Sequence, residues 1–272
     1  MGQLFGARMA MSGVDVVFLD ANPRTVEALN SKGITLRTDL GIEHTAVSAA
    51  QAADITGTFE LFVVFTKGFH TQSAVDSIRH LMGPDSYGLT LQNGLGNTEV
   101  LEHAFGRDRT LLGITDFPAD MEEPGTIASS SQGKVRLGSL SEVPRLHEIA
   151  DLLDRAGLNA SVAEDVRAPI WEKVAFNAAL NTLSAVTAMS VGQIGADAHA
   201  RRIVSMVLEE TFAVAESQGI GPSRQHVDDA LGNAFAHHAD HKTSMLLDRE
   251  AGRPTEVESI GGAIVRLGAE KG

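Results

Sequence analysis

Three polar side chains recur at every fourth position in the otherwise apolar segment WEKVAFNAALN. They are Lys173, Asn177 and Asn181. Residues four apart lie on one face of a helix, so the spacing predicts a polar stripe on a largely buried helix. Buried amides and ammonium groups are costly without partners, which indicates internal partners or a ligand. The alternative is a solvated face, although such faces usually carry Lys, Glu and Gln rather than Asn.

The stripe contains groups suited to carbonyl chemistry. Lys173 has three donors, and because burial lowers the pKa of an ammonium group, it could give a proton to a carbonyl oxygen. Asn177 and Asn181 could donate to a hydroxyl or carboxylate and accept hydrogen bonds elsewhere. These roles predict a site that binds and protonates a small oxygen-rich substrate.

A second group of polar residues follows about sixty residues later along the chain. Ser244 opens the run SMLLD, and Glu256 follows the run GRPT. Pro254 and Thr255 predict a helix start that places Glu256 in the first turn. Each residue also has a purely structural explanation: Ser244 could be a helix cap, and the helix dipole favours a carboxylate at the position of Glu256.

The elements that must position these residues fall into two halves. In the first half, short apolar runs alternate with helical patterns, which predicts a doubly wound α/β domain. Asn22 and Pro23 predict the N-cap and first position of a helix that ends near Gly33. The runs that predict strands are Val14–Leu19, Leu61–Phe65, Tyr87–Leu91, Leu111–Ile114, Thr126–Ser129 and Lys134–Leu137, the last two around a Ser/Gly turn.

The second half is almost wholly helical. Helical apolar spacing extends over Trp171–Ala188, Arg201–Gln218 and Pro254–Leu267. We therefore expect a dinucleotide-binding domain over residues 1–164 and an all-α domain over residues 165–272. Both ends look clipped relative to such domains.

The beginning of the chain carries half of a dinucleotide-binding fingerprint. A Rossmann unit has a strand, the sequence GxGxxG, a helix, and a second strand that ends in an acid. Gly2 stands where the third glycine is expected and Asp20 where the acid is expected, whereas the first strand and two glycines are missing. Asp20 could accept the ribose hydroxyls of NAD, and Arg24 could instead meet the 2′-phosphate of NADP.

Composition excludes several classes of partner. The chain has 22 Lys and Arg against 35 Asp and Glu, a formal charge of −13, so we expect no nucleic acid and no anionic membrane as a partner. The absence of cysteine excludes disulfides and thiol catalysis. No membrane span or signal peptide is visible, which makes the cytoplasm the default location. His237 and His241 have a spacing that can bind zinc, but no HExxH pattern accompanies them, so we expect no metal site.

Taken together, the chain resembles the ketopantoate reductase (2-dehydropantoate 2-reductase) family. The matching segments, in family order, are MGQLFGA (1–7), TKGFHT (66–71), LQNGLGN (91–97), WEKVAFNAALN (171–181) and SMLLDREAGRPTEVESIGG (244–262). The resemblance implies an N-terminal Rossmann domain, a C-terminal helical domain like that of 6-phosphogluconate dehydrogenase, and a site in the cleft between them.

The resemblance also implies residue roles. Lys173 corresponds to the general acid and Glu256 to the group that binds the distal hydroxyl of the substrate. Asn177, Asn181 and Ser244 would hold its hydroxyl and carboxylate groups. Lys67 and Asn93 correspond to contacts of cofactor and substrate, and Gly2, Asp20 and Arg24 would serve the cofactor. The expected cofactor is NADPH, with NADH as the alternative. The expected substrate is a small 2-oxo acid. A homodimer is compatible with the second domain.

Two other functions remain open. The stretch Ile114–Asp120 differs from the small, Gly-containing stretch common in ketopantoate reductases, and relatives on this fold reduce other 2-oxo acids with NADH. An NAD-dependent D-2-hydroxyacid dehydrogenase is therefore the first alternative. The second is a non-catalytic dinucleotide-binding protein. A protein that only binds needs neither a general acid nor a substrate clamp, so this alternative is disfavoured by the joint presence of Lys173, Asn177, Asn181, Ser244 and Glu256.

Overall fold

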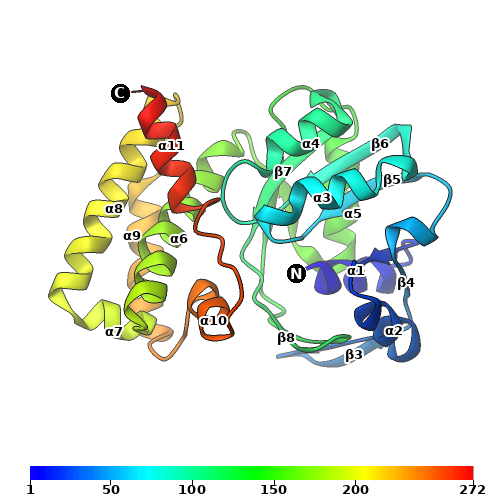
Figure 1. Cartoon of the computed structure of the whole chain (residues 1–272), viewed down its shortest axis with the longest axis horizontal. Coiled ribbons are helices and arrows are strands. Elements are labelled where there is room, and N and C mark those ends of the chain that lie inside the picture. Colours follow the sequence, from blue (N-terminus) through cyan, green and yellow to red (C-terminus); the bar gives the residue numbers. More distant parts are fainter. Residues whose placement is uncertain (272) are drawn as a thin grey trace. The chain divides into compact units, whose positions relative to one another are not determined.

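The computed structural model describes residues 1–271, which form two compact units. An α/β unit holds Met1–Thr66, His70–Gln92 and Thr98–Val166, and a helical unit begins at Arg167 (Figure 1). The short segments Lys67–Phe69 and Asn93–Asn97 group with the helical unit, although they lie in the first half of the sequence.

The α/β unit contains the expected parallel strands. The central sheet has the order β11-β10-β7-β6-β5. Its strands are β5 (Phe59–Val64), β6 (Met82–Thr90), β7 (Thr110–Thr115), β10 (Val135–Gly138) and β11 (Ala160–Val162). Neighbours pair in parallel except β10 and β7. Leu89, Leu111 and Leu137 are fully buried, as expected for strands covered on both faces.

The strand predicted at Val14–Leu19 forms only over β1 (Val17–Leu19), which pairs in parallel with β4 (Ser48–Ala50) as a separate two-stranded sheet. Among the described residues, β1 and β5 thus belong to different sheets. Helix α1 (Gly2–Met11) packs against β1, and its Phe5 ring lies 4.7 Å from that of Phe65, just after β5. The expected parallel sheet is present, but β1 does not join it.

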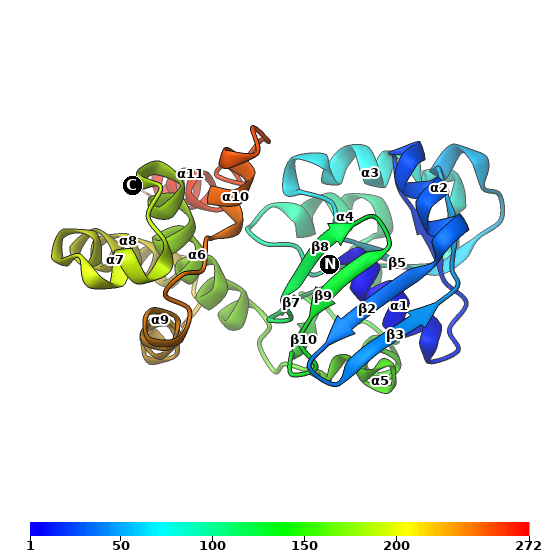
Figure 2. The ribbon, with the colours of Figure 1, turned by 90° about the horizontal axis from the view of Figure 1, so that it is seen from below.

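A four-stranded sheet covers the other side of α1. Its order is β3-β2-β9-β8 (Figure 2). The strands are β2 (Ile34–Thr38), β3 (Gly41–Thr45), β8 (Ala119–Glu123) and β9 (Thr126–Ser129). The strands expected around the Ser/Gly turn, β9 and β10, therefore do not pair with each other: β9 pairs with β2, and β10 pairs with β7.

The helices of the α/β unit follow local signals. The Asn22 side chain caps α2 by accepting from Arg24 N, and Gly33 ends the helix with φ 68°. The α-helices are α2 (Pro23–Lys32), α3 (Thr71–Ser77), α4 (Asn97–Phe105) and α5 (Leu146–Leu153). Shorter helical turns lie at Ala52–Asp54, Gly68–His70, Arg79–Leu81, Arg107–Arg109 and Asp154–Leu158.

The helical unit is built around α6. Its helices are α6 (Arg167–Thr187), α7 (Val191–Ala196), α8 (Ala198–Ser217), α9 (Arg224–His237), α10 (Ser244–Glu250) and α11 (Gly261–Lys271) (Figure 1). One face of α6 contributes Ala175 and Ala179 to a core with α8 and α9, and another contributes Trp171 and Val174 to a second core with α10. None of the described helices is long and apolar enough to cross a membrane.

Candidate functional site

The predicted polar stripe lies on α6. Asn177 and Asn181 are 8% and 6% exposed, and Lys173, one turn earlier, is partly buried. A solvated face would leave both amides exposed, so the stripe is not a solvated surface, and a buried amide of this kind is suited to a ligand.

Helix α10 brings a hydroxyl to the stripe. Thr243 is the N-cap of α10, and its side chain accepts from Leu246 N at 3.3 Å. Ser244 is therefore not the cap, and its Oγ accepts from Asn181 Nδ2 at 3.5 Å. Met245 fixes α10 against α6 because it is buried in the core that contains Trp171. The packing of α10 on α6 thus joins two polar groups from distant parts of the sequence.

Four charged side chains form a cluster one turn further along α10. Lys67 Nζ lies 2.7 Å from Asp248 Oδ2 and 3.4 Å from Glu256 Oε2. Arg253 Nε donates to Asp248 Oδ1 at 2.9 Å, and Gly68 N donates to Glu256 Oε1 at 3.2 Å. Asp248 is 4% exposed and Glu256 8%, so both carboxylates need these partners. The cluster contains two cations and two anions.

The environment of Lys67 keeps it charged. Burial by itself lowers the pKa of Lys67, but the hydrogen bond to Asp248 and the charges of Glu256 and Asp248 outweigh burial and raise that pKa above its usual value. A group with a raised pKa is a weak proton donor near neutral pH. Lys67 is therefore suited to binding an anion or orienting a carboxylate, and not to protonating a substrate.

Glycines hold the two short segments of the helical unit in place. Leu95 N donates to Ser259 O at 2.7 Å. Gly94 has φ 85°, and a Cβ there would overlap Ser259 O. Gly68 also approaches Ser259, whose Oγ would lie 3.1 Å from an added Cβ. These close approaches bring Asn93 and Lys67 to the turn that follows Glu256.

One element prediction at the site is wrong. Glu256 does not lie in the first turn of a helix, because α11 begins only at Gly261. Ser259 N and Ile260 N both bond to Glu256 O, and Gly262 N bonds to Val257 O, so residues 256–260 form a wider turn. The turn leaves the Glu256 carboxylate directed to Gly68 N instead of to its own backbone. The helix-dipole explanation of Glu256 therefore does not hold.

The family profile described as "Ketopantoate reductase PanE/ApbA" matches residues 1–142, and the corresponding "C terminal" profile matches residues 165–272. The chain belongs to the ketopantoate reductase family. The 2-dehydropantoate 2-reductase of Streptococcus pyogenes is 26% identical over 275 residues, which cover 100% of this chain and 89% of that protein.

Solved structures agree with this family. The 2-dehydropantoate 2-reductase of Geobacter metallireducens has a TM-score of 0.92 and 32% identity, and the match covers 100% of this chain and 91% of that one. A D-mandelate dehydrogenase with NADH and anilino(oxo)acetate has a TM-score of 0.93 and 24% identity, with 99% and 89% covered. The similarity to the D-mandelate dehydrogenase shows that the two proteins share a fold.

Within this ketopantoate reductase family member, three of the residues expected to serve the cofactor, Gly2, Asp20 and Arg24, lie far from the charged cluster in the sequence, whereas Lys67 is part of it. Asp20 ends β1, and its Oδ1 accepts from Asn22 N at 2.7 Å. Arg24 is exposed near the start of α2. The third glycine of a Rossmann unit serves close packing of helix and strand. Gly2, at that position, does not do so, because a Cβ there would make only ordinary contact, 3.6 Å from Phe65 Cβ. Gly6 has that role.

A Cβ at Gly6 would overlap the Phe18 ring, so α1 approaches β1 at this glycine. The sequence also gave no role to Asp248 or Arg253. The signal that could have found Asp248 is its position four residues after Ser244, on the same face of a short helix.

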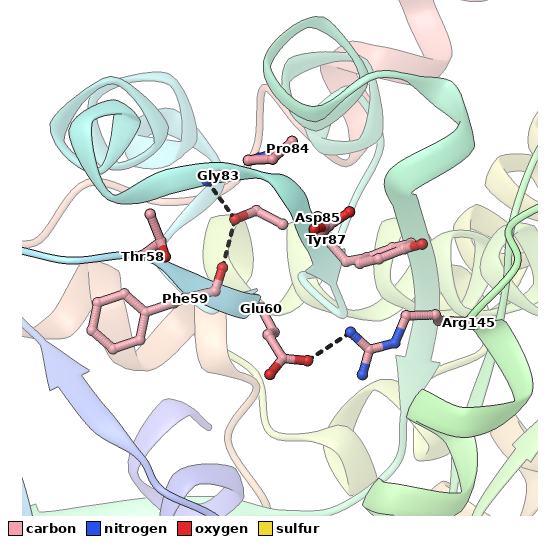
Figure 3. A pocket seen from close by; sticks show the side chains of 9 residues that line it. Thr58, Phe59, Glu60, Gly83, Pro84, Asp85, Tyr87 and Arg145 are labelled. Carbon is pink, nitrogen blue, oxygen red and sulfur yellow. Dashed lines mark hydrogen bonds and ion pairs between the residues drawn. The ribbon is translucent and has the colours of Figure 1, made fainter.

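An open pocket in the α/β unit is lined by none of the predicted site residues (Figure 3). Its cation, Arg145, donates to Glu60 at 2.7 Å and to Glu148, and lies 5.7 Å from the centre of the Tyr87 ring. Ser86 bridges Gly83 N and Phe59 O. The charged and polar groups named here are thus bonded to one another.

Proposed function

We propose that this protein is a 2-dehydropantoate 2-reductase, which reduces ketopantoate to pantoate with NADPH, a step of pantothenate and coenzyme A biosynthesis. One observation carries the proposal. A continuous run of contacts leads from Asn181 to Ser244, along α10 to Asp248, and through Lys67 to Glu256. The run places hydroxyl, amide, ammonium and carboxylate groups together, as a substrate with a carboxylate, a ketone and a hydroxyl requires.

Each side chain has a distinct task in this reaction. As the ketone carbon is reduced, its oxygen becomes an alkoxide, and Lys173 Nζ donates the proton that neutralises it. Asn177, Asn181 and Ser244 hold the oxygen atoms of the substrate and fix its orientation. The buried Glu256 carboxylate accepts the hydrogen bond of the distal hydroxyl.

The cofactor would be held by groups that fit a nicotinamide dinucleotide. It supplies the hydride when bound. The Asp20 carboxylate ends a parallel strand, where ribose hydroxyls bind in such folds, and Arg24 offers a cation for a 2′-phosphate. Lys67, which stays charged, and Asn93, next to Gly94, are the residues of the helical unit proposed to contact the cofactor. Gly2 would contribute through the N-terminal backbone of α1, where amides favour an anion.

One observation favours a second function. The carboxylate of Asp20 suits the unphosphorylated ribose of NAD, and it would repel a 2′-phosphate. An NAD-dependent D-2-hydroxyacid dehydrogenase is therefore the alternative. A non-catalytic dinucleotide-binding protein is a further alternative, and turnover with any 2-oxo acid would eliminate it.

The test is oxidation of NADPH and NADH, followed by absorbance, with ketopantoate and a panel of other 2-oxo acids. We expect turnover with ketopantoate and NADPH that falls by at least about 100-fold in Lys173→Ala, because general acid catalysis contributes roughly 100- to 10,000-fold. Lys242→Ala is the matched control, since Lys242 pairs with Glu250 in an exposed ion pair. Activity confined to other 2-oxo acids with NADH would establish the dehydrogenase instead.

A second pair of variants tests the substrate clamp. Glu256→Gln should raise the KM for ketopantoate, whereas Glu258→Gln, which alters an exposed carboxylate paired with Arg266, should not. Equal effects of the two variants would contradict the role of Glu256. The homodimer expected from the resemblance stays a prediction, which sedimentation equilibrium of the purified protein tests.

A further inference from the structure

Asp248 has no task in the proposed reaction, yet it is the most buried member of the charged cluster. Lys67 Nζ is closer to Asp248, at 2.7 Å, than to Glu256, at 3.4 Å. The first distance is a full charge-assisted hydrogen bond, and the second is at the long end of the range. Lys67 therefore interacts strongly with Asp248 and more weakly with Glu256.

Asp248 is itself held firmly. Its Oδ1 accepts from Arg253 Nε at 2.9 Å, and its backbone oxygen accepts from Arg253 N at 2.8 Å. The preceding residues Met245 and Leu246 are buried, which fixes α10 in the core. The carboxylate is therefore a fixed anchor, whereas Lys67 has a flexible four-carbon chain that is 40% exposed.

The two carboxylates compete for one ammonium group. If Asp248 lost its charge, Glu256 would be the remaining anion within reach of Lys67, and the lysine would move to it. If the Lys67 ammonium group bonded to Glu256, it would occupy the carboxylate oxygen atoms that must accept a hydrogen bond from the substrate hydroxyl. The position of Lys67 therefore decides how available Glu256 is.

We propose that Asp248 is a positioning residue that retains Lys67 as its own counterion and thereby keeps Glu256 available to the hydroxyl group of the 2-oxo acid. The role of Glu256 in this inference rests on the proposed function, whereas the pairing of Asp248 with Lys67 does not. The raised pKa of Lys67, set against the lowering effect of its burial, agrees with a strong interaction with Asp248.

The pairing is tested without turnover by trace acetylation of lysines across a pH series, with peptide mass spectrometry as the readout. In Asp248→Asn, the pKa of Lys67 should fall, and each unit of fall raises the reactive neutral fraction about tenfold. Glu250→Gln is the matched control on the same helix. It removes the partner of Lys242 and should leave the labelling of Lys67 unchanged. Glu256 can still pair with Lys67 in Asp248→Asn, so the deciding comparison is made in the Glu256→Gln background. Labelling of Lys67 that does not rise when Asp248→Asn is added there would overturn the pairing.

The effect on Glu256 is tested by kinetics with two substrates that differ in one hydroxyl. Asp248→Asn should raise the KM for ketopantoate by about tenfold, with a smaller change in kcat, because a lost charge-assisted hydrogen bond is worth roughly this factor. The KM for 3,3-dimethyl-2-oxobutanoate, the same skeleton without the hydroxyl, should hardly change. Equal changes for both substrates would show a general structural defect and would refute the positioning role.

A double variant separates the two carboxylates. In Lys67→Met there is no ammonium group to move, so adding Asp248→Asn should produce little further rise in the KM for ketopantoate. Full additivity of the two substitutions would refute the proposal. Absence of turnover in the unaltered enzyme with every 2-oxo acid would reject the proposed function and the role given to Glu256, while the labelling experiment would still decide whether Asp248 holds Lys67.

Discussion

The Asn181 amide on α6 donates to the Ser244 hydroxyl on α10 across 3.5 Å, although the two residues are 63 positions apart in the chain. This distance is at the outer limit of a hydrogen bond, so the two groups satisfy each other only weakly. Each retains capacity to bind a further oxygen atom. The pair therefore has the geometry of two groups that a ligand can join.

Removing either group should weaken substrate binding. We expect Asn181→Ala and Ser244→Ala each to raise the KM for the 2-oxo acid by about 10- to 150-fold, because hydrogen bonds to a charged group contribute roughly 1.5–3 kcal/mol. Initial-rate kinetics at saturating cofactor measure the effect. Ser205→Ala, which removes an exposed hydroxyl bonded to Glu209 on α8, is the control. A KM unchanged in both site variants would show that the pair is structural.

The cofactor preference should depend on Asp20, directly after β1, and on Arg24, in the first turn of α2. We expect Arg24→Ala to raise the KM for NADPH by about tenfold or more and to leave that for NADH nearly unchanged, because only NADPH has the 2′-phosphate. Asp20→Ala should weaken NADH selectively. Lys32→Ala, at the other end of α2, is the control cation. Equal effects of Arg24→Ala on both cofactors would contradict a contact with the phosphate.

The packing of α1 on β1 depends on the lack of a side chain at Gly6. Gly6→Ala should lower the free energy of unfolding by about 1–3 kcal/mol, because its Cβ would overlap the Phe18 ring in a buried site. Gly2→Ala, where an added Cβ makes only ordinary contact, should cost much less. Urea denaturation followed by circular dichroism measures both. Phe18→Leu in the Gly6→Ala background should restore part of the loss, and its failure to do so would count against the overlap.

The contribution of Lys67 to stability should depend on pH in one direction. Its pKa in the folded protein is above the usual value, so its stabilising effect is fully present below the unfolded pKa of 10.5 and disappears as the pH rises through the folded value. The difference in unfolding free energy between the native protein and Lys67→Met should stay constant from about pH 7 to 9 and shrink above about pH 10.5. A difference that shrank between pH 7 and 9 would contradict the raised pKa.

Local sequence patterns were sufficient where short-range chemistry decides structure. The Asn22-Pro23 start of α2 and its end at Gly33 follow from capping and backbone preference alone. The buried stripe on α6 follows from i, i+4 spacing among apolar residues. The doubly wound sheet follows from the alternation of strands and helices, because parallel strands need helical crossovers.

Other features depended on contacts between distant segments. Pro254 and Thr255 have good helix-start chemistry, but the Asp248–Arg253 bonds and the contact of Glu256 with Gly68 hold the chain in a wider turn. Likewise, β9 and β10 are adjacent in sequence, but β9 pairs with β2 and β10 pairs with β7. Strand pairing depends on side-chain packing against neighbouring strands, which the turn between β9 and β10 does not determine.

The sequence by itself determined on which elements most of the candidate site residues lie, because helix periodicity and capping act over a few residues. Only the tertiary structure decided that Lys67 joins Asp248 and Glu256, which are 181 and 189 positions away. It also decided that the segments around Lys67 and Asn93 group with the helical unit. The physical reason is that a buried charge needs an oppositely charged or hydrogen-bonding partner, and that partner can come from any part of the chain. Local sequence patterns therefore do not identify it.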